Sequence, residues 1–269
     1  TSTTVSGSGT VAVYYFDSVV ITKTDESVVN IQTDGTTSLV ASVYTDESIA
    51  AGDIKSVVLN GTLITSIGDD AFKDCSNLIT GINASNTAIT SIGKFAFKGT
   101  ALTTVTIPDS VTSIGNNAFR SCSALETVTI GDGVETIGTN VFQGCTAMTS
   151  VTIPDSVTSI GNYAFKNCSN TSFTTITIPS SVTSLGSNVF NGCANLITVY
   201  ISSTNGLGIT VGTNQTVSGK TGLIVYYTNV PPVFDSSPST TISRFNIYTY
   251  TIAVSYVNGV DNVTIEATT

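Results

Sequence analysis

The chain contains no histidine and no tryptophan, and methionine occurs only once among its 269 residues. Without an imidazole base, neither a Ser-His-Asp triad nor a Cys-His pair can form. The glycine patterns of P-loops and Rossmann folds are missing as well. A glycosidase that uses only two carboxylates stays formally open, but the acidic residues are scattered and nothing in the sequence gathers them into a cleft. We therefore expect a non-catalytic protein that binds no cofactor.

Charged side chains are scarce, with 9 basic and 18 acidic residues and a formal net charge of −9. Nucleic-acid binding requires a cationic surface against the phosphates, so this balance predicts no nucleic-acid partner. No apolar run approaches the roughly 18 residues that mark a membrane-spanning helix, so no membrane span is expected. The polar surface must come from serine, threonine, asparagine and glycine, a composition that suits exposed β-strands better than helices.

What the chain does contain is a phrase, Ile/Leu-Gly-x-x-Ala/Val-Phe, repeated six times at steps of 22 to 25 residues. The copies begin at Ile67, Ile92, Ile114, Ile137, Ile160 and Leu185. A fixed period in this range is typical of a solenoid, in which each coil buries its apolar side against its neighbours. We predict a repeat solenoid over residues 51–204, an N-terminal β-rich cap over residues 1–50 and a C-terminal β-rich module over residues 205–269.

The copy at residues 102–122 shows how one coil is built. Residues 103–107 alternate polar and apolar side chains, which is the period of a half-buried strand. Pro108 opens a turn, and residues 111–114 form a second short extended segment. Gly115 then permits a sharp corner. Each coil is therefore expected to carry two short strands.

The end of the phrase predicts one helical element in each coil. Ala118, Phe119 and Cys122 fall at helical spacing, so one helical or 3-10 turn is expected there. The sequence thus predicts a β-rich solenoid with short strands and one helical or 3-10 turn in each repeat of about 23 residues. Two copies carry extra residues, near 81–88 and near 169–172, which we expect to form surface loops.

The apolar positions of the phrase predict the structural core. Its phenylalanines are Phe72, Phe97, Phe119, Phe142, Phe165 and Phe190. Cysteine follows three residues later in five of the six copies, at Cys75, Cys122, Cys145, Cys168 and Cys193. One cysteine in each repeat and no histidine do not supply the clustered ligands of a zinc site, so no metal is expected. We predict a column of small buried thiols, with pairing between adjacent coils as the open alternative.

The outward positions of the first strands predict a candidate binding face. Its residues are Thr104, Thr106, Thr127, Thr129, Ser150, Thr152, Thr175, Thr177, Thr198 and Tyr200. Stacked strands lie about 4.8 Å apart, which places these side chains in two parallel columns. Tyr200 and Tyr163 are the nearest candidates for aromatic anchors. The threonine array is also similar to the Thr-x-Thr face of ice-binding solenoids, although threonine is an ordinary residue on exposed strands.

The longer phrase Leu-x-x-Val-x-Ile-Pro-x-x-Val-x-x-Ile-Gly-x-x-Ala-Phe-x-x-Cys resembles the BspA-like, surface-antigen class of leucine-rich repeats. Residues 102–122 and 148–168 match it almost position by position, and the resemblance covers residues 54–201. It implies a curved leucine-rich-repeat solenoid, secreted or displayed on a microbial cell surface, that serves adhesion or protein binding. The resemblance supplies no catalytic residues, so the repeat positions carry over as structural residues alone.

Three functional hypotheses follow from these observations. The first is a non-catalytic scaffold, surface-displayed or secreted, that binds a protein or glycan on another surface, with an extracellular or cell-surface location. The second is a structural subunit of a virion or extracellular filament, which would self-assemble through its terminal β-modules and lie on the virion surface. The third is an ice-binding protein that uses the Thr-x-Thr face.

Overall fold

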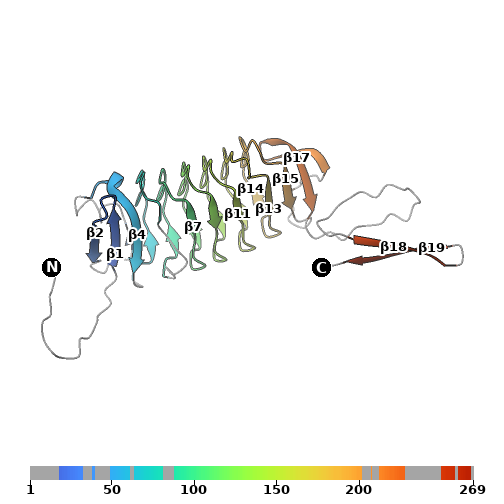
Figure 1. Ribbon diagram of the computed structural model, residues 1–269, viewed down its shortest axis with the longest axis horizontal. Helices are drawn as coiled ribbons and strands as arrows, with labels where there is room; N and C mark the ends of the chain where they lie inside the picture. The colour runs from blue at the N-terminus through green and yellow to red at the C-terminus, as the bar shows by residue number, and fades with distance from the viewer. Residues whose placement is uncertain are drawn as a thin grey trace, which may run out of the picture.

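Short strands stacked in parallel dominate the computed structural model of the chain (Figure 1). It describes residues 18–32, 38–39, 49–60, 64–80, 88–201, 207, 212–227, 250–257 and 260–267. Successive repeats form successive coils of a β-solenoid, which confirms the fold class predicted from the repeat period. Each coil buries its apolar side against the next one, so the stack is the unit that folds.

The first strands of the repeats line one face of the solenoid. β7, β9 and β11 form a three-stranded parallel sheet, with bounds Thr104–Thr106, Thr127–Thr129 and Ser150–Thr152. β13, β15 and β17 pair in parallel farther along this face, with bounds Thr175–Ile178, Thr198–Ile201 and Lys220–Tyr227. The central valines, such as Val105 and Val128, are paired in register and buried, so the residues on either side of them point outward.

The second strands form a longer parallel sheet. Its seven strands are two residues long: β3 (Ser38–Leu39), β5 (Ser66–Ile67), β6 (Ser91–Ile92), β8 (Ser113–Ile114), β10 (Thr136–Ile137), β12 (Ser159–Ile160) and β14 (Ser184–Leu185). The apolar residue of each strand stacks in register on that of the next, as Ile114 does on Ile137. Strands of two residues have no ladder unless coils stack, so this sheet depends entirely on the repeat.

The corner after the second strand is a run of tight turns rather than the helical turn expected from the sequence. In the third copy, the N–H of Ala118 donates to the Gly115 carbonyl at 3.2 Å, and the N–H of Cys122 donates to the Phe119 carbonyl at 3.3 Å. Two residues in each corner have positive φ: Asp70 and Asp74, Phe95 and Gly99, Asn117 and Ser121, Asn140 and Gly144, Tyr163 and Asn167, and Asn188 and Gly192. A left-handed residue ends a right-handed helix, so the apolar spacing comes from consecutive turns. Within the described ranges, Ala51–Asp53 is the one 3-10 helix.

The glycine of the phrase has a different role from the one predicted. Gly115 is not among the residues with positive φ, and a Cβ on it would lie 2.6 Å from the carbonyl carbon of Gly93 and from the nitrogen of Lys94 in the preceding coil. Glycine is therefore needed here for close approach of two backbones. The corners also form a ladder of their own, in which the N–H of Phe119 donates to the Val141 carbonyl at 3.0 Å. Three hydrogen-bonded columns thus hold the coils together.

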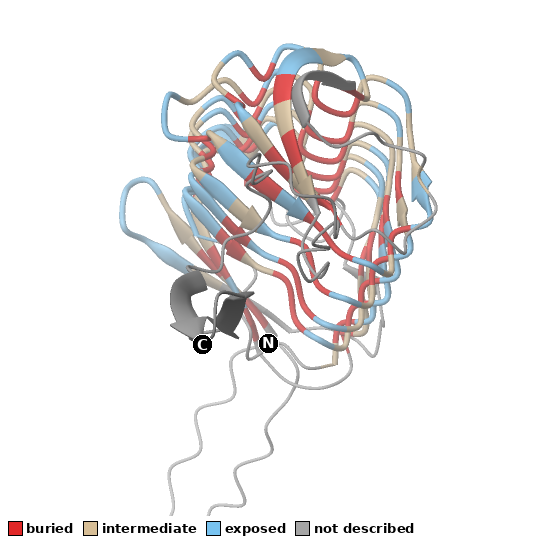
Figure 2. Ribbon diagram, turned by 90° about the vertical axis from the view of Figure 1, so that its right-hand side faces the viewer, coloured by how far each residue is buried: buried red, intermediate tan, exposed pale blue. Residues whose placement is uncertain are grey.

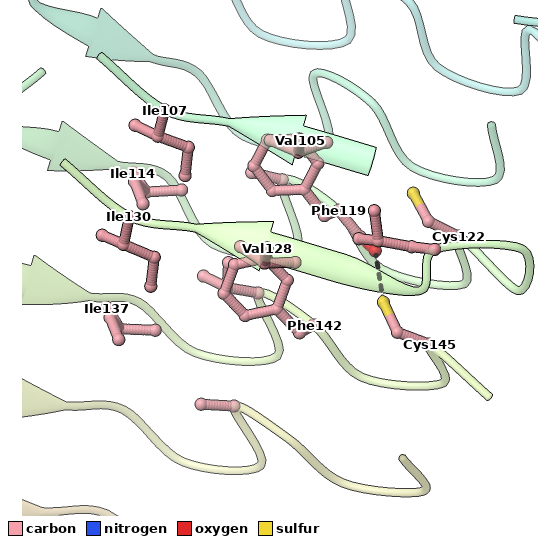
Figure 3. Close-up of a cluster of buried hydrophobic side chains, with 14 of the residues drawn as sticks. Val105, Ile107, Ile114, Phe119, Cys122, Val128, Ile130, Ile137, Phe142 and Cys145 are labelled. Carbon is pink, nitrogen blue, oxygen red and sulfur yellow. Dashed lines mark hydrogen bonds between the residues drawn. The ribbon is translucent and has the colours of Figure 1, made fainter. Parts of the chain in front are cut away.

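The core runs along the inside of the coils (Figure 2). The six phenylalanines of the phrase are buried, and their rings stack at centroid distances of 5.3 to 6.2 Å. The five cysteines are buried too, and all are free thiols. Thiols donate to phenylalanine carbonyls of the preceding coil, as Cys145 does to Phe119 at 3.3 Å (Figure 3). Cys122, Cys145, Cys168 and Cys193 thus each donate to a backbone carbonyl, and none of the five cysteines forms a disulfide.

An antiparallel sheet stands at the N-terminal end of the first-strand face. β1 lies between β2 and β4, with bounds Ser18–Lys23, Val28–Gln32 and Ile54–Asn60. Ser56 of β4 also forms a parallel bridge with Thr80, and the N–H of Ile79 donates to the Lys55 carbonyl at 3.0 Å. β4 thus takes the place of a first strand. The β1–β2 hairpin pairs with the other edge of β4, so it occupies the position where a preceding coil would stack and ends the parallel ladder there.

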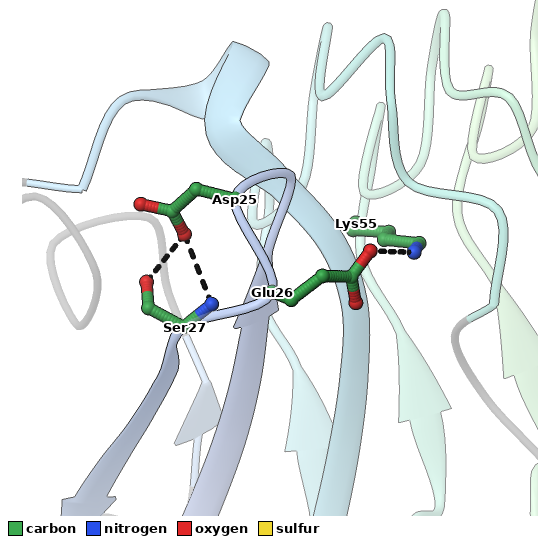
Figure 4. Close-up of polar contacts among 4 residues, drawn as sticks. All are labelled: Asp25, Glu26, Ser27 and Lys55. Carbon is green, nitrogen blue, oxygen red and sulfur yellow. Dashed lines mark hydrogen bonds and ion pairs between the residues drawn. The ribbon is translucent and has the colours of Figure 1, made fainter.

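Polar contacts hold the turn of this hairpin in place (Figure 4). The N–H and the hydroxyl of Ser27 both donate to Asp25 Oδ1, which lowers the pKa of the Asp25 carboxyl. Glu26 forms an ion pair with Lys55 of β4. The turn is therefore tied to the strand that begins the parallel stack.

The C-terminal end of the same face is also closed by an antiparallel strand. β17 pairs with β15 on one side and with β16 (Gly212–Val217) on the other. The β16–β17 turn covers the last corner, where the Ser218 carbonyl accepts the N–H of Phe190 at 3.2 Å and its hydroxyl accepts the N–H of Val189 at 2.9 Å. The hairpin thus fills the hydrogen-bonding positions that another coil would occupy. β18 and β19 pair with each other, with bounds Tyr250–Val257 and Val260–Ala267.

Candidate binding face

The residues predicted as a binding face lie on the outer side of the first strands. We call this set the hydroxyl face: Thr104, Thr106, Thr127, Thr129, Ser150, Thr152, Thr175, Thr177, Thr198 and Tyr200. Strand pairing places Thr104 beside Thr127 and Thr106 beside Thr129, so the side chains form two columns. Each is exposed or half-buried, and none has a side-chain hydrogen bond within the described part of the chain. Their polar groups are therefore available to a partner, and their role in binding stays a prediction.

The second sheet presents another set of hydroxyl groups, which the sequence analysis did not single out. Part of this set bonds inside the molecule: the hydroxyl of Thr158 donates to the Glu135 carbonyl at 3.2 Å, and that of Thr112 donates to the Thr90 carbonyl at 3.3 Å. The outward hydroxyl groups of Ser91, Ser113, Thr136, Ser159 and Ser184 have no such bond to other described residues. The signal for this column is Thr-Ser-Ile-Gly, which stands before four of the six corners, at residues 65–68, 90–93, 112–115 and 158–161.

The hydroxyl face is not one continuous ladder. β11 and β13 belong to different sheets, and the extra residues near 169–172 precede β13. There, the side-chain nitrogen of Asn170 donates to the Ala147 carbonyl at 3.0 Å, and its Oδ1 accepts the N–H of Ser172 at 2.8 Å. The insertion is thus bonded to the preceding coil. The face consequently has one part on β7, β9 and β11 and another on β13, β15 and β17.

Aromatic rings mark the C-terminal part of the face. Tyr200 is paired in register with Tyr226 of β17, and their rings stack with centroids 5.6 Å apart and planes at 22°. Tyr226 lies outside the repeat phrase and was not predicted from the sequence, although residues 224–227 pair in register with the first strand at residues 198–201. Tyr163, the other predicted anchor, lies at a corner with φ +59° and its ring 5.1 Å from the Lys166 ammonium. It is therefore not part of the face.

An open depression of about 400 Å³ lies where the hydroxyl face meets the turns that follow it, and we call it the Gly131 notch. It is lined by Thr106, Thr129 and Thr152 of the face and by the turns of the same three coils, including Pro108, Asp109, Gly131, Asp132 and Pro154. A Cβ at Gly131 would lie 2.5 Å from the carbonyl carbon and oxygen of Pro108, so only glycine allows these two turns to pack this closely. The sequence analysis did not find the notch, since its shape depends on how neighbouring turns stack.

The chemistry of the buried thiols differs from that of a nucleophile. Burial raises the pKa of Cys122 and of Cys193 to about 11, and it raises the pKa of Cys145 and of Cys168 well above the usual value. These thiols stay protonated at neutral pH, and a protonated thiol is a weak nucleophile. Among the described residues, no three Cys, Asp or Glu side chains are grouped as metal ligands. The same ranges include no helix with the length and hydropathy of a membrane span.

Comparison with known families gives a match over most of the repeats. The model of the BspA type leucine-rich repeat region matches residues 49–172 and 125–210, with six copies, which together span more than half of the chain. No curated protein matches the sequence.

Several solved structures are similar to this chain. A leucine-rich repeat protein from Bacteroides ovatus is 23% identical, with coverage of 80% of this chain and 67% of that one and a TM-score of 0.41. A leucine rich cell surface protein from Faecalibacterium prausnitzii is 29% identical, with coverage of 62% and 58% and a TM-score of 0.32. A leucine-rich repeat protein from T. pallidum is 19% identical, with coverage of 65% and 80% and a TM-score of 0.39. The chain thus spans between about half and four fifths of these relatives.

Proposed function

The chain belongs to the BspA-type leucine-rich repeat family, and from this premise we propose that it is a scaffold that binds a protein partner through its hydroxyl face. The observation that carries the proposal is the set of outward hydroxyl groups on the first strands that have no bond to any other described residue. Parallel strands paired in register hold these groups in fixed positions, so little conformational freedom is lost when a partner binds.

The two parts of the face offer different contacts. β7, β9 and β11 present threonine and serine, whose hydroxyl groups can both donate and accept hydrogen bonds. β15 and β17 add the stacked rings of Tyr200 and Tyr226. Tyrosine is enriched among the residues that dominate interface energies because it combines a large apolar surface with a polar group. A face with both kinds of contact suits a protein partner. The test must distinguish binding to a protein from binding to a glycan.

Family membership and the polar, sparsely charged exterior support a location at the cell surface or outside the cell. The proposed role is non-catalytic, in keeping with a sequence that has no histidine and with buried thiols that stay protonated. The two alternatives raised by the sequence have less support. A lattice match to ice would need an unbroken array, whereas the ladder stops between β11 and β13 and carries tyrosine at its end. No contact among the described residues favours a virion or filament subunit.

The test compares two variants on arrays of extracellular proteins and of glycans, with affinities of the hits measured by biolayer interferometry. One variant carries alanine at Thr127, Thr129, Thr152 and Thr175. The matched control carries alanine at Ser113, Thr136, Ser159 and Ser184 of the second sheet. We expect protein hits whose affinity falls about tenfold or more in the first variant, a loss of about 1.4 kcal/mol or more, and stays within about twofold in the control. Equal losses in both variants, or hits on glycans alone, would contradict the proposal.

A further inference from the structure

The Gly131 notch differs in charge from the rest of the hydroxyl face. Asp109 and Asp132 both line it and both are exposed, and Asp155 lies at the same place in the next coil. Asp109 Oδ1 accepts the N–H of Asp132 at 3.0 Å. The other oxygen of Asp109 and both oxygens of Asp132 have no partner among the described residues. Three carboxylates thus repeat at the spacing of the coils.

No cationic side chain of the described chain neutralises these carboxylates. The ion pairs of the structure all lie between residues 23 and 98. Between residues 101 and 199 the basic residues are Arg120 and Lys166, and both belong to the corner turns. Like charges repeated at coil spacing repel one another, so a cation from outside would lower the energy of this edge.

The rest of the notch is suited to an aliphatic chain. Thr106, Thr129 and Thr152, whose side chains each carry a methyl group, supply its accessible lining, and Ile107, Ile130, Pro108 and Pro154 are buried beneath them. The carboxylates do not meet the condition for a metal ion, because no three acidic side chains of the described residues are grouped as ligands. A long side chain with an apolar stem and a cationic end matches both features, since lysine and arginine lay their stems along apolar surface while the charge stays near water.

We infer that the Gly131 notch receives a lysine or arginine side chain of the protein partner, and this inference rests on the proposed function of the hydroxyl face. The aliphatic stem lies against the threonine methyl groups of the notch, and the cationic group lies between Asp109 and Asp132. The partner is then recognised by a basic residue at the notch and by polar contacts with the threonines beside it. The net charge of −9 adds long-range attraction for a basic partner.

The probe is a blocked pentapeptide, Gly-Ser-Lys-Ser-Gly, titrated into isotopically labelled full-length protein and followed by NMR. The matched probe replaces lysine with norleucine, which keeps the stem and removes the charge. We expect saturable shifts of the amide signals of Asp109, Gly131 and Asp132 with the lysine peptide, and weaker binding when salt rises from about 20 mM to about 300 mM. Equal binding of the norleucine peptide, or shifts spread over other acidic sites, would overturn the inference.

Variants decide whether the two carboxylates act together. Asp109→Asn and Asp132→Asn keep the size of the side chains. Each should lower the affinity for the lysine peptide about threefold, as expected for the loss of an exposed ion pair. Glu135→Gln, an exposed acid of the same coil on the second sheet, is the control and should change nothing. Thermal unfolding of each variant checks that the fold is intact. Unchanged binding in Asp109→Asn and Asp132→Asn overturns the inference.

The protein hits of the array experiment separate this inference from the proposed function. If the threonine variant loses the partner while Asp109→Asn/Asp132→Asn retains it, the hydroxyl face binds and the notch does not take a basic side chain. If the aspartate variant loses the partner and the threonine variant does not, the proposed binding by the hydroxyl face is wrong, and the inference about the notch is retained. Loss in both, with the second-sheet control unaffected, is the result that we expect.

Discussion

The two parallel sheets of the solenoid come from the same repeats, yet they present different surfaces. First strands of three or four residues place two outward side chains in each coil, and the hydroxyl groups of those side chains have no hydrogen bond to the part of the chain that the structure describes. Second strands have two residues and form an unbroken seven-stranded ladder, and the hydroxyls of threonines that directly precede them, such as Thr112 and Thr158, bond neighbouring coils. The comparison indicates that the second sheet and the corners hold the coils together, whereas the polar groups of the first-strand face are available to a partner.

The largest expected effect is on the core that both sheets share. Phe142 is fully buried, and its ring stacks between those of Phe119 at 5.6 Å and Phe165 at 5.5 Å. Phe142→Ala should lower the free energy of unfolding by about 3–5 kcal/mol because it leaves a cavity in mid-stack. Urea denaturation measures this change.

The control for Phe142→Ala is a phenylalanine at a corner. Phe95 is half-buried and has φ +56°, a conformation that asparagine tolerates better than an aromatic residue. Phe95→Asn should change the free energy of unfolding by about 1 kcal/mol or less. Equal losses in the two variants would mean that the corner contributes as much packing as the core.

The next effect concerns the thiols of the corner. Burial raises the pKa of Cys122 to about 11 from the ordinary thiol value of 9.0, so the unfolded chain loses this proton first as pH rises. The stabilisation is present below about pH 9 and is lost between about pH 9 and pH 11, and it amounts to roughly 3 kcal/mol for this thiol. Denaturation at a series of alkaline pH values measures the slope.

Cys122→Thr is the matched variant, because Thr100 already occupies this position in another coil and its hydroxyl donates to the Phe97 carbonyl at 2.9 Å. It should keep most of the stability at pH 7 and show a shallower alkaline slope. A slope identical to that of the unmodified protein would show that this thiol is not the titrating group.

The smallest effect is the one that compares the two sheets directly. Thr152 is exposed on the hydroxyl face without a side-chain bond, whereas the hydroxyl of Thr158 donates to the Glu135 carbonyl at 3.2 Å. Thr158→Ala should cost about 1 kcal/mol, and Thr152→Ala should cost about 0.5 kcal/mol or less. Both variants remove the same side-chain atoms from an exposed position, so the difference in unfolding free energy reports mainly the hydrogen bond. A larger loss at Thr152 would reverse the assignment of the two faces.

The sequence predicted the parts of the structure that depend on local pattern. The alternation around Val105 and the repeated phenylalanine and cysteine positions indicated which side chains point inward, and the structure buries them. The prediction of a helical turn in each repeat was wrong. Residues three and four apart also approach each other in consecutive turns, and the turns here contain left-handed residues such as Asn117 and Ser121. Spacing alone does not distinguish these two conformations.

The remaining features come from contacts between coils. The break between β11 and β13, the pairing of Tyr226 with Tyr200 and the Gly131 notch each involve residues more than 20 positions apart in the sequence. The residues that flank the repeats showed strand-like patterns, but a pattern does not tell whether a strand joins an existing sheet or which direction it takes. The antiparallel hairpins that end the first-strand face were therefore outside what the sequence analysis described.

By itself, the sequence determined that this protein is a stack of coils and which side chains face inward, because a period of 22 to 25 residues and a two-residue alternation are properties of the chain alone. Only the tertiary structure decided where the ladders stop, which hydroxyl groups are already bonded and where a notch opens. The physical reason is that hydrogen bonds between coils and close packing of turns arise only when separate segments meet, and their geometry is set by both partners.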